Sequence, residues 1–425
     1  ISPQAPILDW FKGDDVHHNG AFMLLDLYSF ASYMFKKHDN PVMEDHGLSS
    51  PIGEDAYEWF LEMKTPAALT AALPDTLAFW NEVLLHPDYD DFWQERSLEP
   101  HLKDISPAIL VVGGEFDTDD CYGALNTYKL IHENSPETDL HLVYGPWTHG
   151  GWHESDYQGL GTRKFAEGLS TYFMKNIEYP FFRYYLENKG KRPEPVYVFA
   201  SGSDEWQTMD VWPSDDIAFT PMYLSGGKSL STDAPSEEES SSCYVSDPHD
   251  PVPFMEDASR RDKSYMVADQ SFASARNDVL TFVSDELEET LKLEGPLKAE
   301  LEMEISSTDA DVIVMLIDVH PDGYQMLVRG EVFPARYRYS LSDPQPVEPG
   351  KPFRVDFTMN DIAHWVLPGH RLMVQIQSSW FPLVNMNPQT FMDNIYEADE
   401  KDYVKSEITV YHQQDKPSRI LLPVR

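Results

Sequence analysis

The chain has 425 residues, 41% of them apolar and 13% aromatic, so it can bury a large core and is long enough for two or three domains. Asp and Glu number 72 against 32 Lys and Arg, which gives a formal charge of −40. This charge argues against nucleic acid or an anionic membrane as partner, because both require basic surface, and it suits a cationic ligand or a strongly solvated surface.

The two cysteines, Cys121 and Cys243, are too few for a disulfide scaffold, and no C-x-x-C pair indicates zinc. No apolar run reaches transmembrane length, and no signal peptide is recognisable at Ile1. Residues 1–6 resemble the interior of a fold more than a natural terminus. We therefore expect the chain to begin inside a domain.

Residues 22–38 have a helical, aromatic pattern, and residues 39–105 predict several short helices broken by prolines. Their many aromatic side chains are expected mainly to pack between helices, and some would line a pocket if the block is a lid. Helices inserted between two core strands are typical of a cap.

Residues 109–151 organise the rest of the chain. The aliphatic run 109–112 ends in two glycines and predicts a buried strand, 122–133 predicts a helix, and 140–144 predicts a second strand. Asp117 and His149 each follow one of these strands. In open α/β sheets, chemistry collects outside the carboxyl ends of the strands.

The order strand, acid, helix, strand, histidine matches the second and third members of a Ser-Asp-His triad. A serine hydroxyl becomes nucleophilic when an imidazole takes its proton, and a carboxylate holds that imidazole in the correct tautomer. The alternative is that Asp117 caps the following helix and His149 is an ordinary loop histidine. The placement of each residue after its own strand favours the triad.

Residues 160–188 predict a helix interrupted near Pro180, and from residue 196 the pattern changes to short alternating runs separated by turns. This indicates a β-sandwich of the jelly-roll type. The polar stretch 235–242 predicts an exposed loop. The expected strands are 196–199, 278–283, 299–305, 312–319, 371–377, 407–411 and 419–424.

Two acidic pairs stand near the proposed triad, Asp14-Asp15 and Asp119-Asp120. Carboxylates held close together raise one another's pKa unless a cation neutralises them. Three interpretations remain open: solvated loop acids, a metal site formed with His17 and His18, or a site for a substrate ammonium group. The metal site is the weakest of these, because adjacent side chains usually point in different directions.

Several segments together resemble the α-amino acid ester hydrolases, within the wider group of cocaine esterase, X-prolyl dipeptidyl-peptidase and glutaryl acylase relatives. The resemblance covers nearly the whole chain. Near the proposed site it lies in GDDVHHNGAF, GGEFDTDDCYGA and YGPWTHGG. In the predicted sandwich it lies in TPMYLSGG, YVSDPHDPVPF, DVLTFVSDEL, DVIVMLIDVHPDG and GHRLMVQIQSSWFPLVNMNPQTF.

The resemblance implies an α/β fold: part of an α/β-hydrolase core with a helical cap insertion and a C-terminal all-β jelly-roll sandwich. The implied core covers residues 1–22 and 101–192, with the cap at 23–100 and the sandwich at 193–425. It also implies that Asp117 is the triad acid and His149 the general base.

By motif position, the family's ammonium-binding carboxylates fall on Asp15, Asp119 and Asp120, although the family residue matching Asp119 is a glutamate. Cocaine esterase-like relatives are not expected to carry this cluster. The resemblance therefore favours substrates with a free α-amino group, and it implies no cofactor and no metal.

One departure concerns the nucleophile, because no G-x-S-x-G pentapeptide occurs in the 425 residues and Gly202-Ser203-Asp204 predicts a turn. We expect the serine and the oxyanion-hole donors to lie in an N-terminal segment of the same fold outside this chain. A half-sheet lacking that segment would expose an unpaired strand edge.

The predicted function is a serine hydrolase or acyltransferase that acts on esters or amides of α-amino acids, including β-lactam acyl groups, through an acyl-enzyme. The alternatives are an X-Pro dipeptidyl-peptidase, a glutaryl-type acylase or esterase, and an inactive remnant acting as a binding protein. The expected partners are a small ester, amide or short peptide and the N-terminal segment, with neither nucleic acid nor membrane. The sequence leaves homo-oligomerisation and compartment open, and the resemblance is compatible with a periplasmic or secreted protein.

Overall fold

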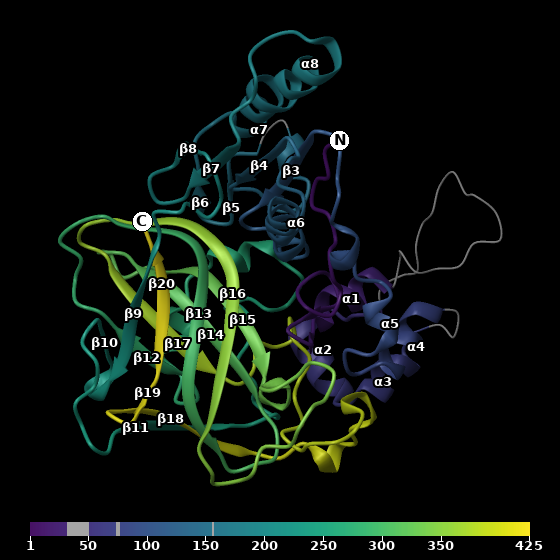
Figure 1. Cartoon of the computed structure of the whole chain (residues 1–425). Helices are drawn as coiled ribbons and strands as arrows, with labels where there is room; N and C mark the ends of the chain where they lie inside the picture. The colour runs from purple at the N-terminus through teal and green to yellow at the C-terminus, as the bar shows by residue number, and fades with distance from the viewer. Residues whose placement is uncertain (32–50, 74–76, 155–156) are drawn as a thin grey trace.

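A computed structural model describes residues 1–31, 51–73, 77–154 and 157–425, and Figure 1 shows the arrangement of their elements. The helices are α1 (Leu24–Ala31), α2 (Ala56–Met63), α3 (Pro66–Ala71), α4 (Ala78–Leu85), α5 (Asp91–Gln94), α6 (Cys121–Asn134), α7 (Leu169–Tyr172), α8 (Tyr179–Glu187) and α9 (Ser271–Ser274). The shorter strands of the first half are β1 (His17–His18), β2 (Ala21–Phe22), β3 (Ile109–Gly114), β4 (Leu140–Gly145), β5 (Gly159–Leu160), β6 (Arg163–Lys164), β7 (Val196–Ala200) and β8 (Glu205–Met209). The strands that follow are β9 (Ala218–Ser225), β10 (Ser229–Ser231), β11 (Ser241–Ser246), β12 (Leu280–Val283), β13 (Leu291–Ile305), β14 (Asp311–Val319), β15 (Gln325–Pro334), β16 (Phe353–Val366), β17 (Arg371–Gln377), β18 (Ser406–Gln413), β19 (Lys416–Pro417) and β20 (Arg419–Val424).

The α/β part is a sheet in the order β3-β4-β7-β8, in which β3, β4 and β7 are parallel and β8 is antiparallel. The predictions of a strand at 109–112, a helix at 122–133 and a strand at 140–144 are confirmed by β3, α6 and β4. Ile109 and Val111 pack with α6, whereas Leu110 and Val112 belong to the main core on the opposite face. Because both faces are covered, the strand is continuously apolar.

The first residues of the chain run along the outer edge of β3. The backbone N–H of Leu110 donates to the Ile1 carbonyl at 3.0 Å, and that of Val112 donates to the Pro3 carbonyl at 3.0 Å. Ala5 N–H donates back to the Val112 carbonyl at 2.9 Å. The sequence predicts an unpaired strand edge in this sheet. Among the described residues, that edge is the outer side of the N-terminal segment, because β3 itself is paired.

Two details of the following region differ from the prediction. The strand at 196–199 does not open the sandwich: β7 pairs in parallel with β4, because the intervening helices form the crossover of a βαβ unit. The helix predicted over 160–188 begins only at α7, after the small β5–β6 hairpin. Pro180 does not interrupt it, because a π-type turn over residues 173–178 precedes α8 and leaves the proline in its first turn, where a missing N–H is tolerated.

The C-terminal β-domain is built from β9 to β20, ordered β11-β18-β13-β20-β9-β10-β12-β17-β14-β15, with β16 paired to β13. The strands predicted at 371–377 and 419–424 are confirmed at both ends by β17 and β20. Buried and partly buried residues alternate along much of β13, as expected for a sheet with one face on the core. Figure 1 shows these strands curling around a common interior below the α/β sheet.

Helices α1 to α5 gather beside both the α/β sheet and the β-domain (Figure 1), and the prediction of several short helices is confirmed for the described residues. The predicted helix over 22–38 is present as α1 up to Ala31, and residues 32–38 lie outside the described residues. The fully buried Trp80 and Trp93 pack in the core, as expected for most aromatic side chains of this block.

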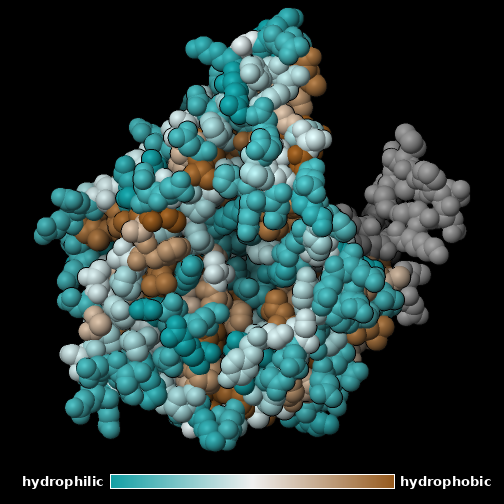
Figure 2. Space-filling model, in the orientation of Figure 1, coloured by the Kyte–Doolittle hydropathy of each residue, from teal (hydrophilic) through white to brown (hydrophobic). Residues whose placement is uncertain are grey.

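The surface matches the strongly acidic composition. Figure 2 shows a face dominated by hydrophilic residues, with only small hydrophobic patches between them. Within the described parts of the chain, no helix has the length and apolar character required to cross a bilayer.

Candidate active site

Asp117 and His149 are brought together by the ends of two neighbouring strands. Gly114 of β3 lies opposite Gly145 of β4, so the two strands end at the same level. The turn after β3 is hydrogen-bonded to the turn after β4, since Phe116 N–H donates to the Trp147 carbonyl at 3.1 Å. A Cβ at Gly114 would lie only 2.2 Å from that carbonyl oxygen, so this close approach requires glycine.

Replacing Gly114 with Ala is expected to lower the free energy of unfolding by about 1–3 kcal/mol, because the added methyl forces the two turns apart. Urea denaturation measures the change. Gly53→Ala is the matched control: Gly53 is exposed, its added Cβ would meet only the Trp59 side chain at 3.3 Å, and a change within about 0.5 kcal/mol is expected. Equal stability of the Gly114→Ala variant and the parent would show that the two turns are not tightly coupled.

The imidazole of His149 faces two carboxylates. Its Nδ1 lies 3.2 Å from Asp117 Oδ2 and 3.1 Å from Asp120 Oδ2. Asp117 Oδ1 meanwhile accepts the backbone N–H groups of Asp119 and Asp120, at 3.2 and 3.4 Å, at the start of α6. Asp117 thus holds the helix start with one oxygen and faces the histidine with the other, so the geometry accommodates both roles weighed from the sequence.

The carboxylates of Asp117 and Asp120 stabilise the protonated form of His149. Hydrogen bonds to Asp117 and Asp120 raise the pKa of His149 from 6.5 to about 10, against the opposing effect of burial. Burial raises the pKa of Asp120 to about 6, and repulsion by Asp117 and Asp119 adds to this while the bond to His149 opposes it. At neutral pH the imidazole is therefore an imidazolium between two carboxylates.

The other predicted ligands of an ammonium group share a cavity of about 460 Å³ with this histidine. Asp15, Asp119, Asp120 and His149 all line it. Asp15 N–H donates to the Asp119 carbonyl at 3.0 Å, which ties the first loop of the chain to the segment after β3. The remaining lining residues are Ala5, Ile7, Trp10, Val16, Leu27, Phe30, Phe79, Arg261 and Lys263.

Asp15 is held by an indole and surrounded by negative charge. Trp10 Nε1–H donates to Asp15 Oδ2 at 3.0 Å. Burial raises the pKa of Asp15 to about 7, and repulsion by Asp120 and Asp119 adds to this while the Trp10 bond opposes it. Such a carboxyl is under-neutralised and would gain from a nearby cation.

Two cations were not anticipated from the sequence as site residues. Arg261 donates from Nη2 to Asp119 Oδ1 at 2.9 Å and also bonds Asp26 through Nε. Lys263 Nζ lies 3.7 Å from Asp119 Oδ2. The run Arg260-Arg261-Asp262-Lys263 stands out in so acidic a chain and is the signal that could have located them. Asp119 is therefore already paired with an arginine and a lysine, whereas Asp120 faces the His149 imidazolium and Asp15 accepts from the neutral Trp10 indole.

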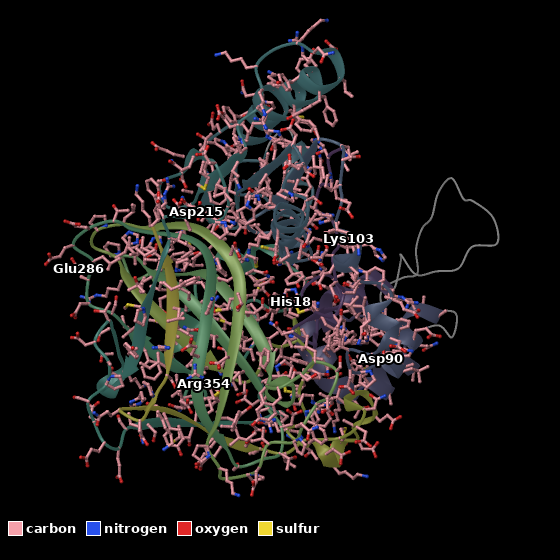
Figure 3. The ribbon with its side chains drawn as sticks, in the orientation of Figure 1. His18, Asp90, Lys103, Asp215, Glu286 and Arg354 are labelled. Atoms are coloured by element: carbon pink, nitrogen blue, oxygen red, sulfur yellow. The ribbon has the colours of Figure 1, made fainter. Side chains whose placement is uncertain are left out.

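The remaining members of the proposed metal cluster point elsewhere. Asp14 is buried and accepts three backbone N–H groups, those of Leu8, Asp9 and Gly123, at 2.7–2.9 Å. His17 Nε2 lies 2.8 Å from the Tyr396 hydroxyl. His18 Nδ1 lies 3.1 Å from Glu331 Oε1 of β15, and Figure 3 shows this histidine between the β-domain and the helical block. These three side chains do not converge on a common ion.

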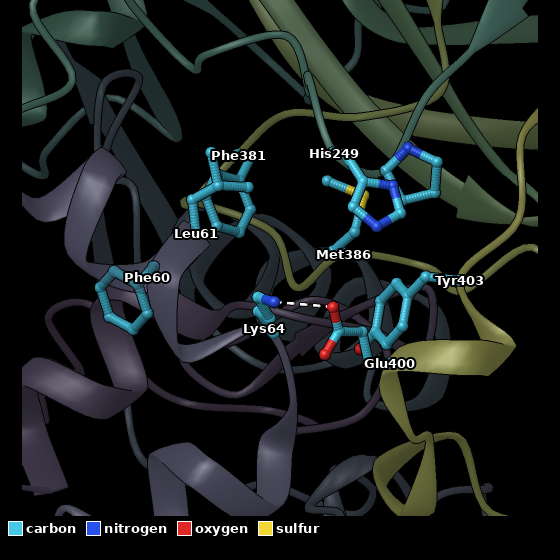
Figure 4. Close-up of a pocket in the computed structure, with 9 residues that line it drawn as sticks. Phe60, Leu61, Lys64, His249, Phe381, Met386, Glu400 and Tyr403 are labelled. Atoms are coloured by element: carbon cyan, nitrogen blue, oxygen red, sulfur yellow. Dashed lines mark hydrogen bonds and ion pairs between the residues drawn. The ribbon is translucent and has the colours of Figure 1, made fainter.

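A second cavity of about 160 Å³ lies between α2 and loops of the β-domain (Figure 4). It is mainly apolar, with Phe60, Leu61 and Phe381 on its wall, and an ion pair joins Lys64 Nζ to Glu400 Oε1 at 2.6 Å. Figure 4 shows Lys64, at the end of α2, pointing toward Glu400 of the β-domain. Its lining also includes His249 and Tyr403, and among these described lining residues no carboxylate contacts a histidine as Asp117 contacts His149.

Comparisons with known proteins give a consistent result. Residues 1–151 match the model of the X-Pro dipeptidyl-peptidase (S15) family, and residues 182–421 match the X-Pro dipeptidyl-peptidase C-terminal non-catalytic domain. Cocaine esterase from Rhodococcus sp. (strain MB1 Bresler) is 31% identical over 363 residues, covering 81% of this chain and 61% of that protein. A putative serine esterase from Mycobacterium tuberculosis is 25% identical over 63% of this chain and 44% of its own length.

Two solved structures cover the whole chain. An aminopeptidase from the marine sediment archaeon Thaumarchaeota archaeon superposes with a TM-score of 0.93 at 31% identity, and an α-amino acid ester hydrolase superposes with 0.91 at 32%. This chain covers 72% of each of those proteins. The chain thus spans less than two thirds of the curated esterases it matches and somewhat more of these two structures.

Proposed function

Because this chain belongs to the X-Pro dipeptidyl-peptidase (S15) family, in the group that includes cocaine esterase and the α-amino acid ester hydrolases, we propose that it forms most of a serine hydrolase for esters or amides of α-amino acids. The observation that carries the substrate assignment is the cavity in which Asp15 and Asp120 lie beside His149. Among the described residues, neither carboxylate forms an ion pair with a lysine or an arginine, so both can accept a substrate ammonium group.

The nucleophile in this proposal is a serine outside the 425 residues, because none of them forms a G-x-S-x-G elbow. His149 takes the serine proton as the hydroxyl oxygen attacks the substrate carbonyl, and it returns that proton to the leaving alcohol or amine. Water or an amine, such as that of a β-lactam nucleus, then attacks the acyl-enzyme and frees the serine. Asp117 keeps Nδ1 of the imidazole protonated throughout.

The substrate itself would prepare the base. A general base works best when its pKa lies near the working pH, and an imidazole with a pKa of about 10 is protonated at neutral pH. A bound ammonium group beside Asp120 competes with the imidazolium for the same carboxylate and lowers the pKa of His149. Covering of the exposed side of His149 by the serine-bearing segment acts in the same direction, since 45% of this side chain is accessible here.

The test compares phenylglycine methyl ester with its des-amino analogue, using the chain together with the segment that carries the serine. The proposal predicts that removing the amino group lowers kcat/KM roughly 30- to 5,000-fold, the equivalent of about 2–5 kcal/mol for losing one member of a buried charge pair. Equal kcat/KM values for the two esters would remove the ammonium site from the proposal. A preference for X-Pro anilides over amino acid esters would favour the peptidase instead.

The peptidase remains the second candidate because the family models that match both carry that name, and a peptide N-terminus presents the same ammonium group. A glutaryl-type acylase would instead need cations to bind the acidic side chain of its substrate. Among the described residues, Arg261 and Lys263 are the arginine and lysine side chains that line this cavity, and they would have to serve that purpose. A fluorophosphonate probe separates all of these enzymes from an inert binding protein. Labelling of the 425-residue chain by itself would show that the nucleophile is misplaced.

A further inference from the structure

A second cluster of histidines lies away from this site, where the β-domain meets the α/β sheet. Asp318 is near the end of β14, His320 follows that strand, and His370 immediately precedes β17. All three line a cavity of about 240 Å³ together with His364 of β16. Gly202, in the β7–β8 turn, forms part of the same wall, so the cavity spans the junction between the two sheets.

Asp318 is the centre of the cluster and is 2% exposed. His370 Nδ1 donates to its Oδ1 at 2.7 Å, and His364 Nε2 donates to its Oδ2 at 3.0 Å. His320 Nε2 lies 3.8 Å from the same Oδ2, and the rings of His320 and His370 are tilted against each other with centroids 4.6 Å apart. One potential ligand atom from each of Asp318, His320 and His370 lies within 4.8 Å of the others.

Three imidazoles around one buried carboxylate are unusual in a merely structural ion-pair network. One histidine suffices to neutralise one carboxylate, and His364 and His370 already pair with both oxygens of Asp318. His320 is therefore not needed to bond Asp318, yet its ring packs against that of His370.

We propose that Asp318, His320 and His370 form a binding site for a divalent transition-metal ion, with Zn²⁺ as the best match. Two imidazoles and a carboxylate are ligands that zinc accepts in a tetrahedral site, and a water molecule in the cavity would complete the four. The imidazole content disfavours Ca²⁺ and Mg²⁺, which prefer oxygen ligands. Nothing in the mechanism proposed above uses these residues.

Binding requires a small closure of the side chains and a change of tautomer at His370. Zinc bonds of about 2.0–2.1 Å place tetrahedral ligand atoms roughly 3.3 Å apart, so ligand atoms that now lie within 4.8 Å of one another must adjust to that spacing. Coordination through Nδ1 of His370 displaces the hydrogen bond to Asp318, and the neutral imidazole then carries its proton on Nε2. His320 and His370 have side chains 29% and 13% accessible, which gives the ion a path of entry.

His364 would orient the carboxylate without binding the ion. Its Nδ1 lies 2.9 Å from Ser201 Oγ in the β7–β8 turn, and the backbone on either side is fixed by two bonds between Ser201 and β16. An arrangement of this kind, in which an outer residue fixes a ligand, typically contributes 10- to 100-fold to metal affinity. Metal binding would therefore stiffen the contact between the β-domain and the sheet that carries Asp117 and His149.

The experiment titrates the full chain, freed of metal by a chelator, with CoCl₂ and ZnCl₂, and follows the visible absorption of Co²⁺ and the heat of Zn²⁺ binding. One equivalent should bind, Co²⁺ should give the intense bands of a tetrahedral site, and Tm should rise. His320→Ala, a change at a partly exposed side chain, should abolish this binding, and His364→Gln should weaken it about 10- to 100-fold.

His149→Ala is the matched control, because Asp117, Asp120 and His149 form the other group of the described residues whose atoms are close enough to hold an ion. Stoichiometric binding should survive in this variant. Loss of binding in His149→Ala with retention in His320→Ala would overturn the proposal, as would the absence of stoichiometric binding to the parent chain. Circular dichroism on each variant establishes that it is folded.

Discussion

Simultaneous replacement of Asp117 and Asp120 by Asn is expected to lower kcat by roughly 10⁴-fold in the enzyme completed with its serine, whereas Asp117→Asn alone should cost distinctly less. The reason is that Asp120 Oδ2 lies as near to His149 Nδ1 as Asp117 Oδ2 does, 3.1 against 3.2 Å. With Asp117 neutral, Asp120 still holds the imidazole in the tautomer that leaves Nε2 free to accept a proton. Turnover of the des-amino ester is the proper measurement, since it excludes any effect of Asp120 on ammonium binding.

The single and double variants form a cycle whose non-additivity measures this sharing. A full 10⁴-fold loss in Asp117→Asn would mean that Asp120 does not support the histidine. Normal turnover in the double variant would remove His149 and its acids from the mechanism. Lys103→Gln, which removes a charge from an exposed side chain, serves as a variant that alters net charge without touching His149 or its acids.

Asp15→Asn is expected to lower kcat/KM for the α-amino ester by roughly 30- to 5,000-fold and to leave the des-amino ester unchanged. Asparagine is nearly isosteric and keeps an oxygen for the Trp10 indole, so the loss reports on charge and not on packing. The two substrates are measured side by side on the same preparation. Equal losses for both esters would indicate a general disturbance of the site and would contradict an ammonium-binding role.

The same variant should be more stable than the parent at alkaline pH. The pKa of Asp15 is raised in the fold, from 3.8 to about 7, mainly by burial, so the folded state binds the proton more tightly than the unfolded state does. Its contribution to stability is therefore present at low pH and is lost as pH rises through about 4 to 7. Urea denaturation at pH 4 and pH 8 should show a gain for Asp15→Asn only at the higher pH, as expected when charge repulsion is kept for function.

Local patterns were sufficient to locate the two strand ends at which Asp117 and His149 lie. The apolar run of β3, the glycines that end it and the apolar run of β4 locate two parallel strands, and the residue types just past their ends select Asp117 and His149. The two strands meet because of a contact that the pattern does not contain, the approach of the Trp147 carbonyl to Gly114. The sequence shows the glycine but not the distant atom that requires it.

Features that depend on contacts between residues far apart in the sequence were harder to predict. Val196–Ala200 has the composition of a sandwich strand, and only its parallel pairing with β4 assigns it to the α/β sheet. The long strand β16 was not predicted, although apolar and polar residues alternate regularly from Phe353 to Asn360. Arg261 reaches Asp119 from 142 residues away, so its role depends on how the β-domain packs against the site. Charge pairing of this kind depends on the tertiary fold and cannot be predicted from the local periodicity of the sequence.

The mechanism, the substrate effect and the first two predictions rest on one premise. Asp117 and Asp120 both interact with the imidazole of His149. A ¹⁵N NMR titration of His149 in the full chain measures it without a substrate. We expect its pKa well above 6.5, near 10, and a return toward 6.5 when both aspartates are replaced by Asn. A value at or below 6.5 in the unmodified chain would contradict the account.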